Sequence, residues 1–315
     1  MKKQAPDPAA AQMAVLEGAA RAEYAVALLT PKTRRDTLRS ALGVLARTPN
    51  DAARPLLADL FDHYARKGGA HDYGGYVRAD IVRALQRVAR QDDAPLLLRA
   101  CATYEFPPPS FAEEGALLRS TALAALVDVD ETLARLEAAR LLVDAHTDPN
   151  SGEPALTAAR ALALCGDQIP LYQYATDVQR AQGEGSRADI VGECLRGLTR
   201  LPPALLPLVI ARFGDKAAPA ARLGLYDLLL RHSDGPQAVE FLMGEVRHAP
   251  LELARYLLLA LVALGDDALL GETVRTLGLV SDSARRNVAR EALELVSSRA
   301  DVRVLLAGWK GNIED

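Results

Sequence analysis

Histidines, cysteines and carboxylates are the side chains of this chain best suited to metal binding or nucleophilic chemistry. Two histidines come together with carboxylates only in the segment 61–76, FDHYARKGGAHDYGGY, which contains Asp62, His63, His71 and Asp72. Metal sites often combine these residue types. A flexible stretch with two adjacent glycines separates the two His/Asp pairs, however, so the spacing fixes no ligand geometry. We therefore predict neither a metal site nor a bound cofactor.

The three cysteines are interpreted as packing residues. Cys165 falls on a helix position predicted to be buried, and Cys194 takes a slot otherwise held by Ala or Gly. Cys101 lies in a predicted helix in which no histidine adjoins it. The chain also lacks the glycine-rich and serine-centred motifs of nucleotide-binding proteins and hydrolases. The sequence thus favours a protein without catalytic residues, and unpaired thiols favour the cytoplasm.

The composition favours packed helices over sheets. Half of the residues are apolar but only 5% are aromatic, and Ala and Leu dominate the apolar set. A net charge of -4 gives no general attraction to nucleic acid or to an anionic membrane. The longest apolar run, at 256–265, is too short to span a bilayer. We expect a soluble, all-α protein.

A leucine preceded by a small residue recurs along the chain at intervals of 43, 41, 36, 33, 30, 36 and 32 residues. The eight leucines are Leu42, Leu85, Leu126, Leu162, Leu195, Leu225, Leu261 and Leu293. The positions four before and three after each leucine share its face in a helix. All sixteen of those positions are apolar. The pattern predicts eight helices that each bury one stripe.

After each predicted helix come a short polar break and a second apolar run, as in ARQDDAPLLLRA and LGDDALLGETVRTL. Asp, Ser, Thr and Pro in these breaks are typical of helix N-termini. The phrase RADIV opens two such units, at 78–82 and 187–191. A helix pair of this size cannot bury its apolar stripe alone, so neighbouring pairs must stack.

The segments GEPALTAARALALCGDQIPLYQY and DSARRNVAREALELVSSRADVRVLLAGW resemble HEAT repeats, particularly the bacterial type named after the phycobilisome lyases. The resemblance covers about 31–309. It implies a right-handed α-α superhelix of about eight helix-turn-helix repeats within 31–315, preceded by a tail and a capping helix in 1–30. In that family the second helices usually line the concave surface.

The first two intervals are longer because the chain carries extra residues at 67–76 and 104–115. These Gly-rich and Pro-rich segments are expected on the surface, at turns between helices. Seven of the fifteen aromatic residues fall within 61–111. We predict a partner-binding site formed by His71, Asp72, Tyr73, Tyr76, Tyr104 and Phe106. The alternative is that the rings cover seams left by irregular stacking.

The function predicted from these patterns is a non-catalytic scaffold that binds a protein or peptide through its concave surface and early loops. One alternative is nucleic-acid binding, as in HEAT-like DNA glycosylases, for which Lys32, Arg34, Arg35 and Arg39 supply a cationic helix flank. Another is a lyase or chaperone that acts on a protein-bound chromophore. The sequence leaves the partner's identity and the oligomeric state open.

Overall fold

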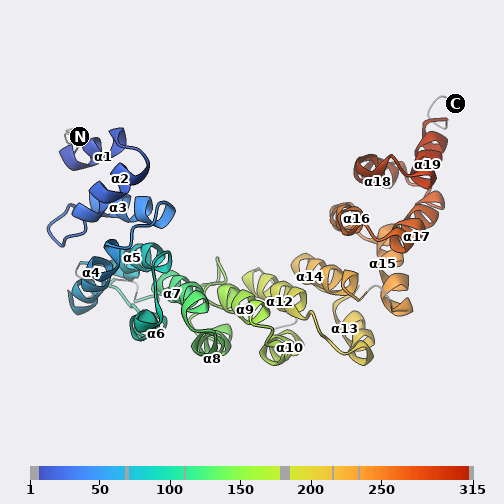
Figure 1. The fold of residues 1–315 in the computed structure, drawn as a ribbon. Coiled ribbons are helices and arrows are strands. Elements are labelled where there is room, and N and C mark those ends of the chain that lie inside the picture. Colours follow the sequence, from blue (N-terminus) through green and yellow to red (C-terminus); the bar gives the residue numbers. More distant parts are fainter. Residues whose placement is uncertain are drawn as a thin grey trace. The chain divides into compact units, whose positions relative to one another are not determined.

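The computed structural model shown in Figure 1 is all-α, as predicted. It describes residues 7–67, 71–109, 111–177, 185–214, 216–232 and 235–311, and within these ranges no strand occurs. None of the helices in the described ranges is both long and apolar enough to cross a membrane. The chain divides into two compact units, Met1–Asp167 and Gln168–Asp315.

The first unit is built from helices that follow one another in contact. Its helices are α1 (Pro8–Val15), α2 (Gly18–Ala27), α3 (Arg35–Arg47), α4 (Ala53–Lys67), α5 (Tyr76–Gln86), α6 (Ala94–Cys101), α7 (Ala116–Val129), α8 (Glu131–Leu142) and α9 (Ala155–Leu164). The helices α3, α5, α7 and α9 contact one another in that order, with α4, α6 and α8 beside them (Figure 1). Both α1 and α2 pack on α3, so the segment 1–30 contributes two helices where one was predicted.

The second unit repeats this serial contact. Its helices are α10 (Gln168–Thr176), α12 (Ser186–Gly197), α13 (Leu206–Phe213), α14 (Pro219–Leu230), α15 (Pro236–His248), α16 (Leu251–Leu264), α17 (Asp267–Gly278), α18 (Ser283–Leu293) and α19 (Ala300–Gly311). The helices α12, α14, α16 and α18 contact one another in order, and so do α13, α15, α17 and α19. The predicted division of the chain at residue 30 stays a prediction.

The leucine positions found in the sequence form the core of both units. Each of the eight leucines lies in a different helix and is at most 1% exposed. The positions four residues earlier are also all buried. The positions three residues later are less uniform: Leu264 is exposed, and Val88, Val129, Cys165 and Val296 are half-buried. These five positions lie at or beyond the last residue of their helix.

Aspartates in the polar breaks cap the helices that follow, as the sequence predicted. Asp130, Asp266 and Asp282 accept hydrogen bonds from backbone N–H groups in the first turns of α8, α17 and α18. These bonds satisfy donors that have no partner within the helix. Short polar segments therefore suffice to end one helix and start the next.

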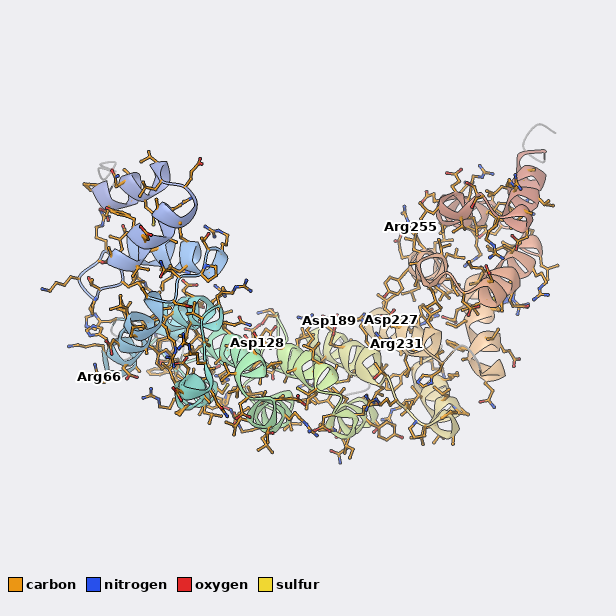
Figure 2. The ribbon with its side chains drawn as sticks, viewed as in Figure 1. Arg66, Asp128, Asp189, Asp227, Arg231 and Arg255 are labelled. Atoms are coloured by element: carbon orange, nitrogen blue, oxygen red, sulfur yellow. The ribbon has the colours of Figure 1, made fainter. Side chains whose placement is uncertain are left out.

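Polar side chains also join successive helices within each unit. In the first unit, Gln86 on α5 donates to Asp128 on α7 at 2.8 Å. In the second, Asp227 on α14 accepts from Arg196 on α12 at 2.6 Å and from the Tyr256 hydroxyl on α16 at 2.8 Å. Asp128 and Asp227 are labelled in Figure 2. Partly exposed bonds of this kind add little stability but help fix the register between neighbouring helices.

The closest helix contact of the second unit depends on two glycines, one in α12 and one in α14. A Cβ atom on Gly224 would lie 2.1 Å from the backbone oxygen of Gly192. A Cβ atom on Gly192 would lie 2.4 Å from the backbone oxygen of Ala220. No side chain fits at this crossing, so the two backbones approach each other directly.

Gly224→Ala is therefore expected to destabilise the second unit by about 1–3 kcal/mol, because α12 and α14 must move apart to admit the methyl group. The free energy of unfolding is measured in urea, with the fluorescence of Trp309, the sole tryptophan, as the reporter of this unit. The matched control is Gly271→Ala in α17, where an added Cβ meets no atom within 4 Å. Higher helix propensity should make the control neutral or stabilising by up to about 1 kcal/mol. Equal effects of the two substitutions would contradict the close approach.

Candidate partner-binding surface

The predicted surface residues Tyr73, Tyr76 and Phe106 are exposed. Their exposed fractions are 45%, 39% and 45%, and nearby Phe111 reaches 66%. These four are the only aromatic side chains of the chain in the exposed class; the other eleven of the fifteen are buried or half-buried. His71 is exposed beside Tyr73, and residues 68–70 of the same segment lie outside the described residues. The first unit thus concentrates exposed aromatic side chains on two segments, which we call the aromatic loops. The first loop is 71–76, which leads into α5, and the second is 102–109 with 111–115, between α6 and α7.

The prediction that Asp72 belongs to this surface is wrong, because its side chain is fully buried. Its carboxylate accepts hydrogen bonds from the backbone N–H groups of Val77 at 2.8 Å and Arg78 at 3.2 Å. It also accepts from Arg78 Nε at 2.9 Å. Asp72 therefore holds the first turn of α5 in place from the buried side of the helix and cannot contact a partner.

The loop between Asp72 and α5 makes a tight left-handed turn. Gly74 and Gly75 have φ angles of 66° and 69°, which side chains with a Cβ rarely adopt. A Cβ on Gly74 would also lie 2.6 Å from the Tyr76 ring and 3.1 Å from Glu114 of the second loop. The second aromatic loop therefore packs against the turn at Gly74 in the first.

Tyr104 is half-buried and lies beneath the exposed ring of Phe106. Its hydroxyl donates to Asp144 at 3.2 Å and accepts from Arg140 Nη1 at 3.0 Å. His146, on the loop after α8, stands edge-on to both rings, with centroid distances of 5.5 Å to Tyr104 and 5.3 Å to Phe106. The structure thus adds His146, which the sequence analysis had not selected, and places Tyr104 as a support for the surface.

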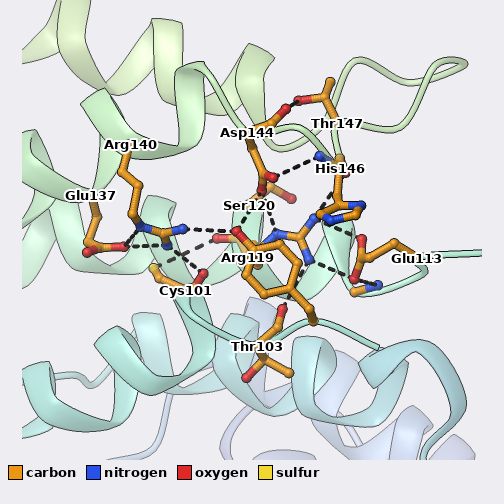
Figure 3. Close-up of polar contacts among 12 residues, drawn as sticks. Cys101, Thr103, Glu113, Arg119, Ser120, Glu137, Arg140, Asp144, His146 and Thr147 are labelled. Carbon is orange, nitrogen blue, oxygen red and sulfur yellow. Dashed lines mark hydrogen bonds and ion pairs between the residues drawn. The ribbon is translucent and has the colours of Figure 1, made fainter. Parts of the chain in front are cut away.

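A fully buried arginine, Arg119 of α7, organises this region, as Figure 3 shows. Its guanidinium makes a two-pronged pair with Glu113 at 2.7 and 2.8 Å and lies 3.1 Å from an Asp144 oxygen. It also donates to the backbone oxygens of Thr103 at 3.0 Å and His146 at 3.1 Å. One side chain thereby ties together the loop before α7 and the loop after α8.

The guanidinium of Arg119 also faces the Tyr104 ring, with its carbon 4.2 Å from the ring centroid. A cation over an aromatic face is attracted by the electrons of the ring, and more strongly where water is excluded. The ring of Tyr104 is therefore held by its face as well as by its hydroxyl. Tyr104 therefore gives the exposed aromatic side chains a support that is fixed in position.

A second buried arginine has the same arrangement two helices earlier, on α5. Arg78 of α5 is buried and pairs with Asp72 and with Glu105 of the second loop. Burial opposes its charge, but these hydrogen bonds outweigh burial and raise the pKa of the Arg78 guanidinium. The sequence signal is shared by the two arginines: each follows a carboxylate by six residues and precedes a repeat leucine by seven, Leu85 or Leu126.

The groups first considered for metal or nucleophilic chemistry are separated in the structure. No three His, Cys, Asp or Glu side chains among the described residues are grouped to hold a metal ion. Cys101 and Cys194 are buried, whereas Cys165 is half-buried. Burial raises the pKa of the Cys101 thiol to about 12 and also raises the pKa of Cys165. The packing interpretation fits Cys101 and Cys194 better than Cys165, which lies at the exposed end of α9.

Comparisons with known proteins identify no family for this chain. No family model and no curated protein matches it. One solved structure, aminopeptidase A of Legionella pneumophila in complex with aspartic acid, aligns at 15% identity with a TM-score of 0.31. The alignment covers 91% of this chain and 36% of that chain, so this chain spans little more than a third of its length. A likeness this weak supports no inference about fold or activity.

Arg119→Met is expected to destabilise the first unit by about 3–5 kcal/mol, because Glu113 and Asp144 would stay buried without their partner. Thermal or urea unfolding followed by circular dichroism measures the loss. Hydrogen exchange should accelerate in residues 103–109 and 143–147, since Arg119 holds both loops.

The control is Arg135→Met, which removes a partly exposed pair with Asp167 at 3.2 Å and should cost about 1 kcal/mol or less. Neutralising both acids as well, in the triple variant Arg119→Met with Glu113→Gln and Asp144→Asn, should restore part of the lost stability. A triple variant less stable than Arg119→Met would refute the view that the arginine mainly compensates buried charge.

The thiols should react in the order of their exposure. At pH 8 a thiol with a pKa of about 12 is ionised in only about one molecule in ten thousand, so native Cys101 should resist a thiol-specific reagent. Half-buried Cys165 should be labelled first. Mass spectrometry of labelled peptides gives the order, and labelling in denaturant provides the control in which all thiols react. Native Cys101 reacting as fast as Cys165 would contradict the packing described above.

Proposed function

We propose that the chain is a protein- or peptide-binding scaffold built as a HEAT-like solenoid of about eight helix pairs. The serial contacts of α3, α5, α7 and α9 in one unit, and of α12, α14, α16 and α18 in the other, support the repeat part of the proposal. So does the burial of one leucine in each of these helices. A stacked array exposes long surfaces and needs no reactive group to bind a partner.

The observation that carries the binding proposal is the location of the exposed aromatic side chains. All four lie close together in the sequence: Tyr73 precedes α5, Tyr76 is its first residue, and Phe106 and Phe111 lie between α6 and α7. Surface aromatics gathered in one region are typical of contact sites, since each ring offers a large area and loses little conformational entropy on binding. Scattered exposed apolar residues would carry no such meaning.

The buried arginines support the same proposal through rigidity. Arg78 and Arg119 hold the loops from beneath before any partner arrives. A preorganised loop loses less entropy on binding than a flexible one, so more of the contact energy contributes to affinity. Seam-covering rings, the alternative interpretation, would pack against neighbouring side chains and would not remain 39–66% exposed.

The cationic helix flank gives less support to nucleic-acid binding. Arg34, Arg35 and Arg39 each lie within 4.0 Å of a carboxylate oxygen, from Asp7, Asp72 and Asp80 respectively. Arginines already paired in this way gain less from a phosphate backbone. We propose a cytoplasmic protein whose partner is another polypeptide, bound without a cofactor.

The proposal predicts that peptides selected from a displayed random library against the intact chain bind through the aromatic loops. The variant Tyr73→Ala/Tyr76→Ala/Phe106→Ala should bind the selected peptides at least about tenfold more weakly, since anchor side chains at such surfaces contribute 1–2 kcal/mol or more each. Fluorescence anisotropy of labelled peptides measures the affinities.

The control removes two even more exposed apolar side chains from the same unit, Leu136→Ala and Leu164→Ala, and should leave binding unchanged. Circular dichroism checks that both variants remain folded. Peptides that bind the aromatic variant as tightly as the wild type, or a library that yields no binder, would refute the proposal.

A further inference from the structure

A basic hollow lies in the first unit where α2, α3 and α5 meet. None of the residues that line it belongs to the aromatic loops. Its volume is about 450 Å³, many times the ~30 Å³ that a liquid water occupies. It is lined by Arg21, Arg39, Ser40, Gly43, Arg47 and Asp80. Three guanidinium groups and a single carboxylate leave this lining with a net charge of +2.

The single carboxylate of the lining, Asp80, already accepts hydrogen bonds from two arginines. Asp80 accepts from Arg39 Nε at 2.6 Å through one oxygen and from Arg83 Nη1 at 2.9 Å through the other. Neither Arg21 nor Arg47 has an ion pair or hydrogen bond to the side chain of Asp80. The positive charge of the hollow is therefore not neutralised by its own lining.

Arg21, on α2, contributes a partly buried guanidinium to the hollow. Its Nε atom is shielded from solvent and has no hydrogen-bond partner among the described residues. The side chain lines the hollow, and because its Nε atom has no accessible surface, an anion bound there would meet the guanidinium through its other nitrogens.

Gly43 shapes the hollow beside Arg47. The Nη1 atom of Arg47 would lie 3.7 Å from a Cβ at position 43, so the guanidinium passes over the bare backbone of α3. A larger side chain at this position would occupy the space between Arg47 and the helix.

We propose that Arg21 and Arg47 form a binding site for a phosphate group, either free or carried as a monoester, beside the Arg39–Asp80 pair. A phosphate carries a charge of about -1.5 to -2 at pH 7, which matches the net charge of the lining. Planar guanidinium groups pair with its oxygens through two parallel hydrogen bonds, a geometry that lysine does not offer. The site is separate from the aromatic surface and does not rest on the proposed peptide binding.

The test titrates the intact chain with inorganic phosphate and with N-acetyl-phosphoserine amide, by calorimetry at one ionic strength. Constant ionic strength removes the general screening effect of the added salt. The wild type should bind at least one of the two with a Kd of about 1 mM or tighter. Binding of phosphate alone identifies a closed site for the free ion, and binding of the monoester identifies a site for a phosphorylated ligand.

The variant Arg21→Ala/Arg47→Ala should weaken this binding at least about tenfold, because each guanidinium contributes a charged hydrogen bond. Arg47→Ala alone should weaken it as well, and because the Arg47 side chain is exposed, its removal takes nothing from the core. The control Arg66→Ala/Arg135→Ala removes the same charge from exposed positions elsewhere in the unit and should bind as the wild type does. Arg66 is labelled in Figure 2.

Two results would overturn the proposal. One is the absence of binding for both ligands in the wild type. The other is an equal loss of affinity in the Arg21→Ala/Arg47→Ala and Arg66→Ala/Arg135→Ala variants, which would show that net charge alone attracts the phosphate. Neither result would bear on the aromatic loops, because the peptide test uses different residues and a different ligand.

Discussion

Each helix in this chain has an apolar stripe that only another helix can keep from water. The stripe is narrow, with one leucine and the residue four positions earlier as its most deeply buried members. Because Ala, Cys and Gly fill the remaining slots, neighbouring helices approach closely, and at Gly192 and Gly224 their backbones touch. Burial of apolar area gives most of the favourable free energy of folding, so this serial contact underlies every other feature.

In the two longer loops, buried ion pairs hold the chain in position, as apolar packing does elsewhere in the molecule. Arg78 and Arg119 occupy equivalent positions on α5 and α7, and each pairs with a carboxylate on the loop before its helix and another on a later loop. Buried ion pairs add little net stability, because desolvation offsets their attraction. They do demand one geometry, and that geometry holds the aromatic loops in place.

The first unit therefore combines two surfaces of different chemistry. The aromatic loops offer apolar area on a rigid base, whereas the hollow between α2, α3 and α5 offers unneutralised guanidinium groups. Tyr76 and Asp80 are four residues apart on α5 and so lie on one face of it, one helical turn from each other.

The sequence by itself determined the all-α class, the polar breaks that cap the helices, and which leucines are buried. These features follow from residue type and a period of 3.6, which are local properties. The same period predicted burial wrongly for Leu264, which is exposed, and only in part for Cys165, which is half-buried. Both residues lie at the end of their helix. The two copies of RADIV bury the same Ala, Ile and Val, yet Arg78 is buried and Arg187 is exposed.

Only the tertiary structure decided which charged and aromatic side chains face solvent. Asp72 and Tyr73 are neighbours in sequence, but the first caps α5 from inside and the second points outward. Phe61 and Tyr64, counted with the surface aromatics in the sequence, belong to the core. Arg119 and Glu113, from the segment that leads into α7, meet Asp144 and His146, from the loop after α8. Their contacts depend on how loops from successive helices come together, and no local pattern encodes that distance.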